Sequence, residues 1–124
     1  MGMMSREKGK RGEREVAAIL RDHGYNDAHR GVQYHGGADS PDVVGLPGFH
    51  IEVKRTEKFY VWTALAQAKA DSSEDEIPLV VHRQNGRDWI AVMPFEDLLN
   101  LLDKINDQEK EGGDHHGSQE EGLR

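Results

Sequence analysis

A helical pattern of apolar residues is the first clear feature of the chain, and it covers about residues 9–23. Val16 and Ala17 recur with other apolar residues at helical spacing, so they share one face of the expected helix. Glu13 lies three and four residues before them and therefore belongs to the same face. Gly24 follows as a typical end signal. The sequence thus predicts a helix that carries a carboxylate on its core side.

Residues 49–55, FHIEVKR, have the different period of a β-strand. Three apolar residues alternate there with His50, Glu52 and Lys54, so we expect the three polar side chains on one common face. Residues 42–46, DVVGL, predict a second short strand, and a Pro-Gly turn separates the two. We expect these strands to form an antiparallel hairpin.

The rest of the chain adds further elements of both kinds. We expect a weak strand at 27–33, a helix at 62–70 that extends toward residue 73, strands at 78–83 and 88–93 around the turn Asn85-Gly86, and a Leu-rich helix that begins near Pro94. The order is helix, three strands, helix, two strands, helix. It predicts an α/β fold in which helices flank a mixed five-stranded sheet, and the helical link allows the third and fourth strands to be parallel.

The aromatic and histidine residues add little to this pattern. Phe59, Trp62, Trp89 and Phe95 are interpreted as core residues. The histidines show no spacing that suits zinc, so we expect surface or loop positions for all of them. The Leu-rich last helix is interpreted as a core helix, with a dimer face as the alternative because its apolar stripe is wide.

Length and composition limit the class of protein. The 124 residues are enough for one compact domain, and the absence of cysteine excludes disulfides and cysteine-bound zinc. No segment resembles a signal peptide or is apolar enough to span a bilayer, so we expect a soluble, cytoplasmic protein with no membrane partner. We divide the chain into a flexible basic arm at 1–8, a folded domain at 9–106 and a disordered acidic tail at 107–124.

The net charge of −7 argues at first against a nucleic-acid partner, but its distribution weakens that objection. Residues 1–60 carry +1, whereas 61–104 and 105–124 each carry −4. The N-terminal sequence SREKGKRGER is locally basic, and attraction to phosphate depends on local potential more than on total charge. A nucleic acid therefore remains a suitable partner for the N-terminal half.

Asp42, Glu52 and Lys54 form the combination with the clearest chemical meaning. Asp42 begins the strand expected beside Glu52 and Lys54, so two carboxylates and an ammonium group should meet on one patch. Acids buried together need a positive partner. Mg²⁺ suits such a patch because it binds carboxylates, a carbonyl such as that of Val53, and several waters.

Glu13 is expected to reach the same ion, directly or through water. Glu15 is its rival, but its position on the helix points it more to the side. The structural alternative is that Glu52 and Lys54 simply alternate on a solvated strand. A carboxylate on the apolar face of a helix is the feature that this alternative explains least well.

Pro41-Asp42 followed by Glu52-Val53-Lys54 matches the PD-(D/E)xK nuclease signature. More narrowly, the chain resembles the archaeal-type Holliday junction resolvases and their phage relatives over about residues 8–100. The likeness includes the helix sequence KGKRGERE at 8–15 and the later strands PLVV and WIAV. It implies a restriction-endonuclease-like αβββαβ core. The implied catalytic set is Glu13, Asp42 and Glu52 as metal-linked acids and Lys54 as the catalytic lysine.

This resemblance also implies an activity and partners. The protein would be an endodeoxyribonuclease that cuts branched DNA in recombination, with Mg²⁺ as cofactor and Mn²⁺ as a substitute. A homodimer would supply the two active sites that paired cuts in a four-way junction require. A phage or prophage origin would place the protein in the host cytoplasm. Whether one or two metal ions act stays open at this point.

Several further residues are candidates for contacts with DNA. Arg14 and Arg30 fall where the resembled enzymes use basic residues, and Ser40 lies in the loop before Asp42. Others could bind phosphate or belong to a solvated face; these are Lys10, Arg11, Arg55 and Lys58. Gln67 resembles the glutamine that supports the lysine in many related nucleases, and an ordinary helix surface position is its alternative.

Two other functions are compatible with the sequence. The first is a nuclease of the same fold that acts on nicked, flapped, single-stranded or restriction-type duplex DNA. The second is a non-catalytic DNA-binding or phage assembly module that kept the fold. The complete set of acids argues against the second alternative, because a binding module has no need of it.

Overall fold

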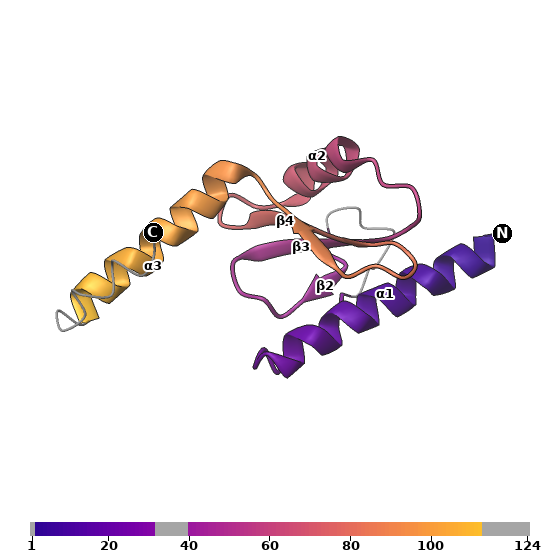
Figure 1. The fold of residues 1–124 in the computed structure, drawn as a ribbon, viewed down its shortest axis with the longest axis horizontal. Coiled ribbons are helices and arrows are strands. Elements are labelled where there is room, and N and C mark those ends of the chain that lie inside the picture. The colour runs from indigo at the N-terminus through magenta and orange to yellow at the C-terminus, as the bar shows by residue number, and fades with distance from the viewer. Residues whose placement is uncertain (1, 32–39, 113–124) are drawn as a thin grey trace. The chain divides into compact units, whose positions relative to one another are not determined.

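The computed structural model of the chain describes residues 2–31 and 40–112. Its helices and strands follow the order that the sequence predicts (Figure 1). They are α1 (Gly2–Asp22), β1 (His29–Arg30), β2 (Val43–Val44), β3 (Phe49–Arg55), α2 (Val61–Asp71), β4 (Ile77–Arg83), β5 (Ile90–Val92) and α3 (Phe95–Gly112).

The strands form one mixed sheet in the order β1-β2-β3-β4-β5. Neighbouring strands are antiparallel except for β3 and β4, which are parallel along their whole length. Parallel pairing needs a crossover connection, and α2 provides it between these two strands. The predicted α/β fold with a mixed five-stranded sheet is therefore confirmed.

The alternation along β3 gives the sheet two different faces, and α1 and α2 cover opposite ones (Figure 1). On the α1 side, Ile51 and Val53 pack with residues of α1 such as Val16 and Ala17. On the α2 side, Ala64, Leu65 and Ala68 pack around Val80 of β4. The polar residues of β3 lie on the α2 side, where Lys54 contacts α2. The more apolar face thus holds the larger core, and the polar face is available for chemistry.

Two expected boundaries are wrong at the ends of the chain. α1 begins at Gly2, so residues 2–8, which were expected to be a flexible arm, are helical. This segment is rich in Arg, Lys and Glu, which favour helices, and Glu7 and Arg11 are spaced for an i,i+4 ion pair. α3 continues to Gly112, so residues 107–112 of the expected disordered tail are also helical. The remainder of that tail, 113–124, lies outside the described residues.

The expected strand at 27–33 is shorter in the structure, and most of the following loop is not described. β1 contains His29 and Arg30 alone. Residues 32–39, which include most of the Gly-rich segment before Asp42, lie outside the described residues. The expected strand at 42–46 is likewise reduced to Val43–Val44. Ser40 marks the point at which the described chain resumes.

The chain divides into two compact units, 1–93 and 94–124, and α3 lies in the second. The four exposed aliphatic side chains of α3 are Leu98, Leu99, Leu102 and Ile105. The interpretation of α3 as a core helix, and the alternative of a dimer face, both stay predictions. An amphipathic stripe of leucines gives the same sequence pattern whether a helix packs in its own domain or on another partner. The α1, α2 and sheet residues form the first unit by themselves.

Four side chains differ from the expected burial. Trp62 and Phe95 are 79% and 70% exposed, although core positions were expected. His50 and His82 are buried, although surface positions were expected. Each buried ring has a partner: the His50 ring contacts Glu52, and the His82 ring stacks on Phe59 with centroids 4.0 Å apart. No helix among the described residues has the length and apolar character that crossing a membrane requires.

Candidate active site

Asp42 stands at the start of β2, directly opposite the acid of the neighbouring strand. The register pairs Val43 with Ile51, which places Asp42 across from Glu52. The Asp42 N–H donates to the carbonyl of Ile51 at 2.8 Å, and the Val53 N–H donates to the Asp42 carboxylate at 2.8 Å. Backbone groups of Ile51 and Val53 thus hold both the backbone and the carboxylate of Asp42 beside β3. The antiparallel hairpin that the sequence predicts is confirmed.

The surroundings of Asp42 penalise its negative charge. Burial raises the pKa of Asp42 to about 6, and the nearby carboxylate of Glu52 acts in the same direction. The Val53 N–H and the Lys54 ammonium group oppose the shift but do not cancel it. An added cation would strongly stabilise the ionised form of a carboxylate in this position.

Glu13 reaches the same region from α1. Its side chain is 18% exposed, and its Oε1 accepts a hydrogen bond from Nε of Arg30 at 2.8 Å. Burial is the main cause that raises the pKa of Glu13, and the charge of Asp42 contributes to the same shift. Its rival Glu15 is engaged elsewhere, since that carboxylate accepts hydrogen bonds from Arg83 and Trp89. Of Glu13 and Glu15, Glu13 is thus the one whose charge interacts with that of Asp42.

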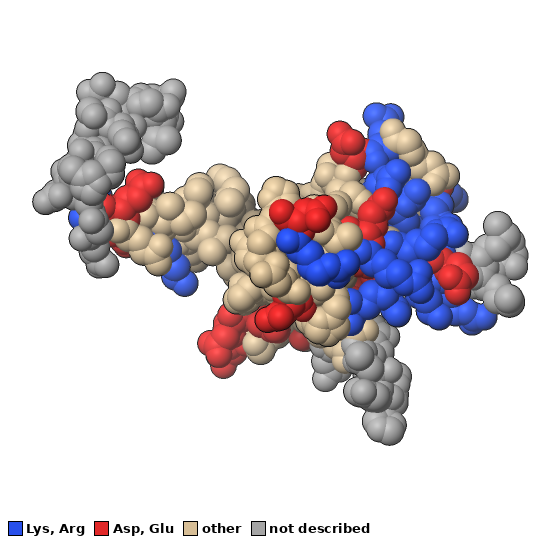
Figure 2. All heavy atoms as spheres, turned by 90° about the horizontal axis from the view of Figure 1, so that it is seen from below, with Lys and Arg blue, Asp and Glu red and all other residues tan. Residues whose placement is uncertain are grey.

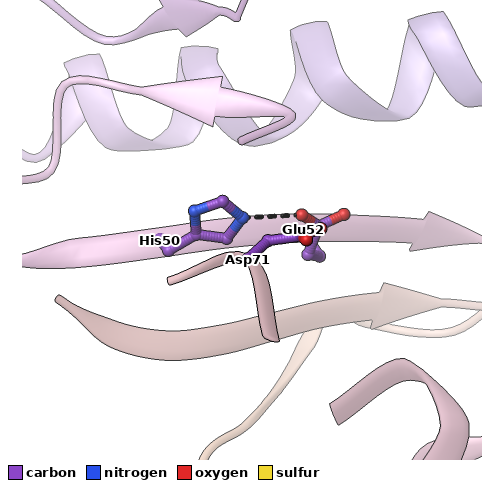
Figure 3. Close-up of side chains that lie close together, drawn as sticks. All are labelled: His50, Glu52 and Asp71. Carbon is purple, nitrogen blue, oxygen red and sulfur yellow. Dashed lines mark hydrogen bonds and ion pairs between the residues drawn. The ribbon is translucent and has the colours of Figure 1, made fainter. Parts of the chain in front are cut away.

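Glu52 and Lys54 extend from β3 toward α2, as the alternation predicts. Glu52 is almost fully buried, and its Oε2 lies 2.7 Å from Nε2 of His50 (Figure 3). Nζ of Lys54 donates to Oε1 of Gln67 at 3.4 Å. The structure therefore brings Gln67 next to the lysine, where the sequence comparison suggested support. A cavity of about 270 Å³ opens beside this pair and is also lined by Lys58, Phe59 and Tyr60.

The donor set around Asp42 fits a hard divalent cation. Within a strand, the N–H and C=O of one residue point to the same side, and the Val53 N–H points to Asp42. The Val53 carbonyl therefore also points toward that side of the strand. Oxygen donors of Asp42, Glu52, Glu13 and this carbonyl match the preference of Mg²⁺ for a few carboxylates completed by water.

A basic groove is lined by α1 and by the last residues of β3 and β4. It has a volume of about 540 Å³, and Figure 2 shows the Lys and Arg side chains gathered over this part of the molecule. The cations that line it are Lys8, Arg11, Arg14, Arg21, Arg55 and Arg83. Glu15 is the acid in the same lining, where it pairs with Arg83. The groove has the charge of a surface that follows a phosphate backbone.

The groove contains only part of the predicted DNA-binding set. Arg11, Arg14 and Arg55 line it, whereas Lys58 lies beside Lys54 in the smaller cavity and Arg30 binds Glu13. Lys10 is exposed on α1, and Ser40 lies two residues before Asp42.

Sequence reasoning missed three cations of the groove and two residues near Glu52. Arg21 follows Arg14 by seven residues, so helical spacing could have indicated it. Lys8 was assigned to the arm, and Arg83 joins the groove only through the fold. His50 could have been found from its alternation with Glu52, whereas Asp71 comes from a distant helix end. The missed residues are Lys8, Arg21, Arg83, His50 and Asp71.

Comparison with known proteins agrees with this geometry. No curated protein and no solved structure matches the chain. One family model, described as "Phage putative PDDEXK endonuclease", matches residues 4–118. The match spans nearly the whole chain and includes α1, the β2–β3 hairpin and α2. The protein therefore belongs to this phage PDDEXK endonuclease family.

Proposed function

We propose that the protein is a Mg²⁺-dependent endodeoxyribonuclease that hydrolyses phosphodiester bonds in branched DNA, with a four-way junction as its preferred substrate. One observation carries the proposal: Asp42 lies opposite Glu52 on the central strand β3, which also presents Lys54, and Glu13 of α1 is close enough for its charge to interact with that of Asp42. Membership of an endonuclease family supports DNA cleavage. Preference for the junction rests on the sequence resemblance to resolvases.

The chain's own residues have distinct tasks in this mechanism. Asp42, Glu52 and the Val53 carbonyl would hold the metal ion, with Glu13 bound to it directly or through water. When bound, Mg²⁺ (or Mn²⁺ as a substitute) lowers the pKa of a coordinated water and neutralises charge that develops on the phosphate. Lys54 orients or deprotonates the attacking water or holds the scissile phosphate.

Two neighbours keep this machinery in position. Gln67 accepts a hydrogen bond from Lys54 and restricts where its ammonium group can lie. Arg30 donates to Glu13 and holds that carboxylate near Asp42. In-line attack on the phosphorus then breaks the bond to the 3′ oxygen and leaves a 5′-phosphate on the product, as the resemblance to resolvases implies.

Binding of DNA is proposed to involve both the basic groove and the smaller cavity beside Lys54. The groove of Lys8, Arg11 and Arg14 offers charge for a duplex backbone, and Lys58 and Tyr60 lie close to the catalytic lysine. Paired cuts in a junction need two active sites, so we propose a homodimer. The exposed apolar side chains of α3 are suited to an interface between two copies. A phage nuclease of this kind would act in the host cytoplasm.

The test compares cleavage by the wild-type protein, Asp42→Asn and Asp88→Asn on equally labelled DNA substrates with Mg²⁺. Asp88 is exposed and lies outside the site, so its variant controls for loss of one negative charge. We expect Asp42→Asn to cut on the order of 100-fold more slowly or worse, while its DNA affinity is retained. EDTA should stop wild-type cleavage.

Each outcome of the substrate panel decides between functions. A preference for four-way junctions supports the proposal. If linear, nicked, flapped or single-stranded DNA is cut as fast as the junction or faster, junction resolution is contradicted. The protein would then be a nuclease of the same fold with another substrate. If the wild-type protein binds DNA and cuts none of the substrates with either Mg²⁺ or Mn²⁺, the nuclease proposal is contradicted and a non-catalytic DNA-binding role is supported.

A further inference from the structure

A second group of metal-binding side chains lies between β3 and the end of α2. His50, Glu52 and Asp71 each offer one ligand atom, and these three atoms lie within 4.8 Å of one another (Figure 3). Ligands bound about 2.1 Å from one ion are roughly 3 to 4 Å apart, so small side-chain rotations would complete such a site. The group shares Glu52 with the proposed Mg²⁺ site but approaches it from the α2 side.

Asp71 supplies an independent reason to expect a ligand here. Its Oδ2 atom is buried and has no hydrogen-bond partner in the part of the chain that the structure describes. Buried polar atoms nearly always have a partner, because the loss of water is otherwise uncompensated. His50 and Glu52 beside it are buried more deeply still, with side chains 1% and 5% exposed.

The contacts of the two ring nitrogens of His50 suit a histidine that binds a metal ion through Nε2. Nε2 points to Glu52 at 2.7 Å, while Nδ1 lies 3.7 Å from Oε1 of Glu76. The Ser73 N–H holds that glutamate oxygen at 2.9 Å. Metal-bound histidines commonly present their other nitrogen to a carboxylate, which fixes the tautomer that leaves the ligating nitrogen free. Glu76 lies on that side of the ring, 3.7 Å from Nδ1, so a small rotation would let it support the ring in this way.

The charge in this region leads to the same conclusion. Two carboxylates face one imidazole in a buried space, and Glu76 adds a third negative charge nearby. A divalent cation would balance the two ligating acids. A set of one nitrogen and two oxygen donors suits Zn²⁺ or Mn²⁺, whereas Mg²⁺ prefers oxygen alone.

We propose that His50, Glu52 and Asp71 form an accessory transition-metal site that takes Zn²⁺ and fastens the end of α2 to β3 behind the proposed catalytic carboxylates. Bound metal would fix the orientation of Glu52 and give the buried Oδ2 atom of Asp71 a partner. The site shares Glu52 with the proposed Mg²⁺ site but has His50 and Asp71 as its other ligands in place of Asp42 and Glu13. It also does not depend on the protein being a nuclease.

The experiment titrates ZnCl₂ into the full chain that carries Asp42→Asn, so that the proposed Mg²⁺ site is already impaired. Calorimetry would measure affinity, and thermal unfolding would measure the rise in Tm that zinc causes. Adding Asp71→Asn should lower zinc affinity at least 10-fold and remove most of the Tm rise. Adding Asp75→Asn, an exposed acid four residues later, should change neither. Glu76→Gln should weaken binding less than Asp71→Asn.

A second readout avoids dependence on variants that could fold poorly. In wild-type protein labelled with ¹⁵N, zinc should shift the imidazole Nε2 resonance of His50, whereas the His82 ring serves as an internal control. If the wild-type protein binds zinc at this site but does not cut DNA with Mg²⁺, the proposed function alone is contradicted. The accessory site is overturned if the His50 resonance does not respond to zinc. It is also overturned if Asp71→Asn and Asp75→Asn bind zinc equally.

Discussion

Asp42 is held where its own charge is unfavourable, as expected for the metal-binding role proposed for it. Burial and Glu52 raise its pKa, although a backbone N–H and Lys54 stabilise its ionised form. Structural ion pairs usually shift a carboxylate in the other direction. This unfavourable charge supports the proposal that Asp42 binds a cation, and it has a measurable consequence in the metal-free protein.

We predict that Asp42→Asn stabilises the metal-free protein at neutral pH. Asp42 has an ordinary pKa of 3.8 when unfolded and about 6 when folded, so its contribution is favourable below pH 4 and is lost as pH rises to 6. The difference corresponds to about 3 kcal/mol at most. Urea unfolding in EDTA should show the variant about 1–3 kcal/mol more stable than wild type at pH 7.5, with a smaller difference at pH 4.

The pH dependence separates this electrostatic effect from altered packing. Asparagine retains an oxygen that can accept the Val53 N–H, so the hydrogen bond at this position can persist. Saturating Mg²⁺ should narrow or reverse the difference, because it stabilises the wild-type protein more. An equal stability difference at pH 4 and pH 7.5 would mean that the charge of Asp42 is not penalised in the folded state.

The elements position the site through unusually close backbone approaches. Gly31 follows β1, and its N–H donates to the carbonyl of Asp42 at 2.8 Å. A Cβ at this position would lie 2.1 Å from the carbonyl oxygen of Pro41, which is backbone and cannot rotate away. Gly31 therefore allows β1 to lie directly beside the Pro41-Asp42 segment.

We predict that Gly31→Ala displaces Asp42 and lowers cleavage more than it lowers DNA binding. The clash should cost about 1–3 kcal/mol in the free energy of unfolding and reduce kcat by about 10-fold or more. Gly9→Ala is the matched control, since a Cβ there meets no atom within 4 Å and alanine favours the helix. Similar kcat values for the two variants would show that the β1 contact does not position the site.

The sequence predicted elements best where local pattern and tertiary packing agree. The bounds of β3 were predicted because its alternating side chains do face two different layers. The role of α3 could not be predicted uniquely, since a leucine stripe has the same pattern in a core helix and at a dimer face. Asp42, Glu52 and Lys54 could be brought together from one hairpin. Asp71 could not, because the crossover through α2 decides what covers the polar face of β3.

At the scale of the whole molecule, the distribution of charge matters more than its sum. The chain has a net charge of −7, yet the groove beside α1 is lined by six cations and one acid. Salt at physiological strength screens charges beyond about 8 Å, so DNA in this groove would respond mainly to the local cations.

We predict that the groove determines how DNA binding depends on salt. Each phosphate contact adds about 0.9 to the slope of log K against log salt concentration for duplex DNA. The double change Arg11→Gln with Arg14→Gln should therefore lower the magnitude of that slope by about 2 if both residues contact phosphate. Fluorescence anisotropy at several salt concentrations would measure it.

The control removes two charges from exposed positions outside the groove, with Lys69→Gln and Arg87→Gln. Both double variants have the same net charge, so any difference between them reports where the DNA lies and not how acidic the protein has become. Cleavage at saturating DNA should change much less than affinity in both, because Arg14 acts on Glu13 through its charge alone and the hydrogen bond of Glu13 comes from Arg30. Equal salt slopes for the two double variants would place the DNA on another face of the molecule.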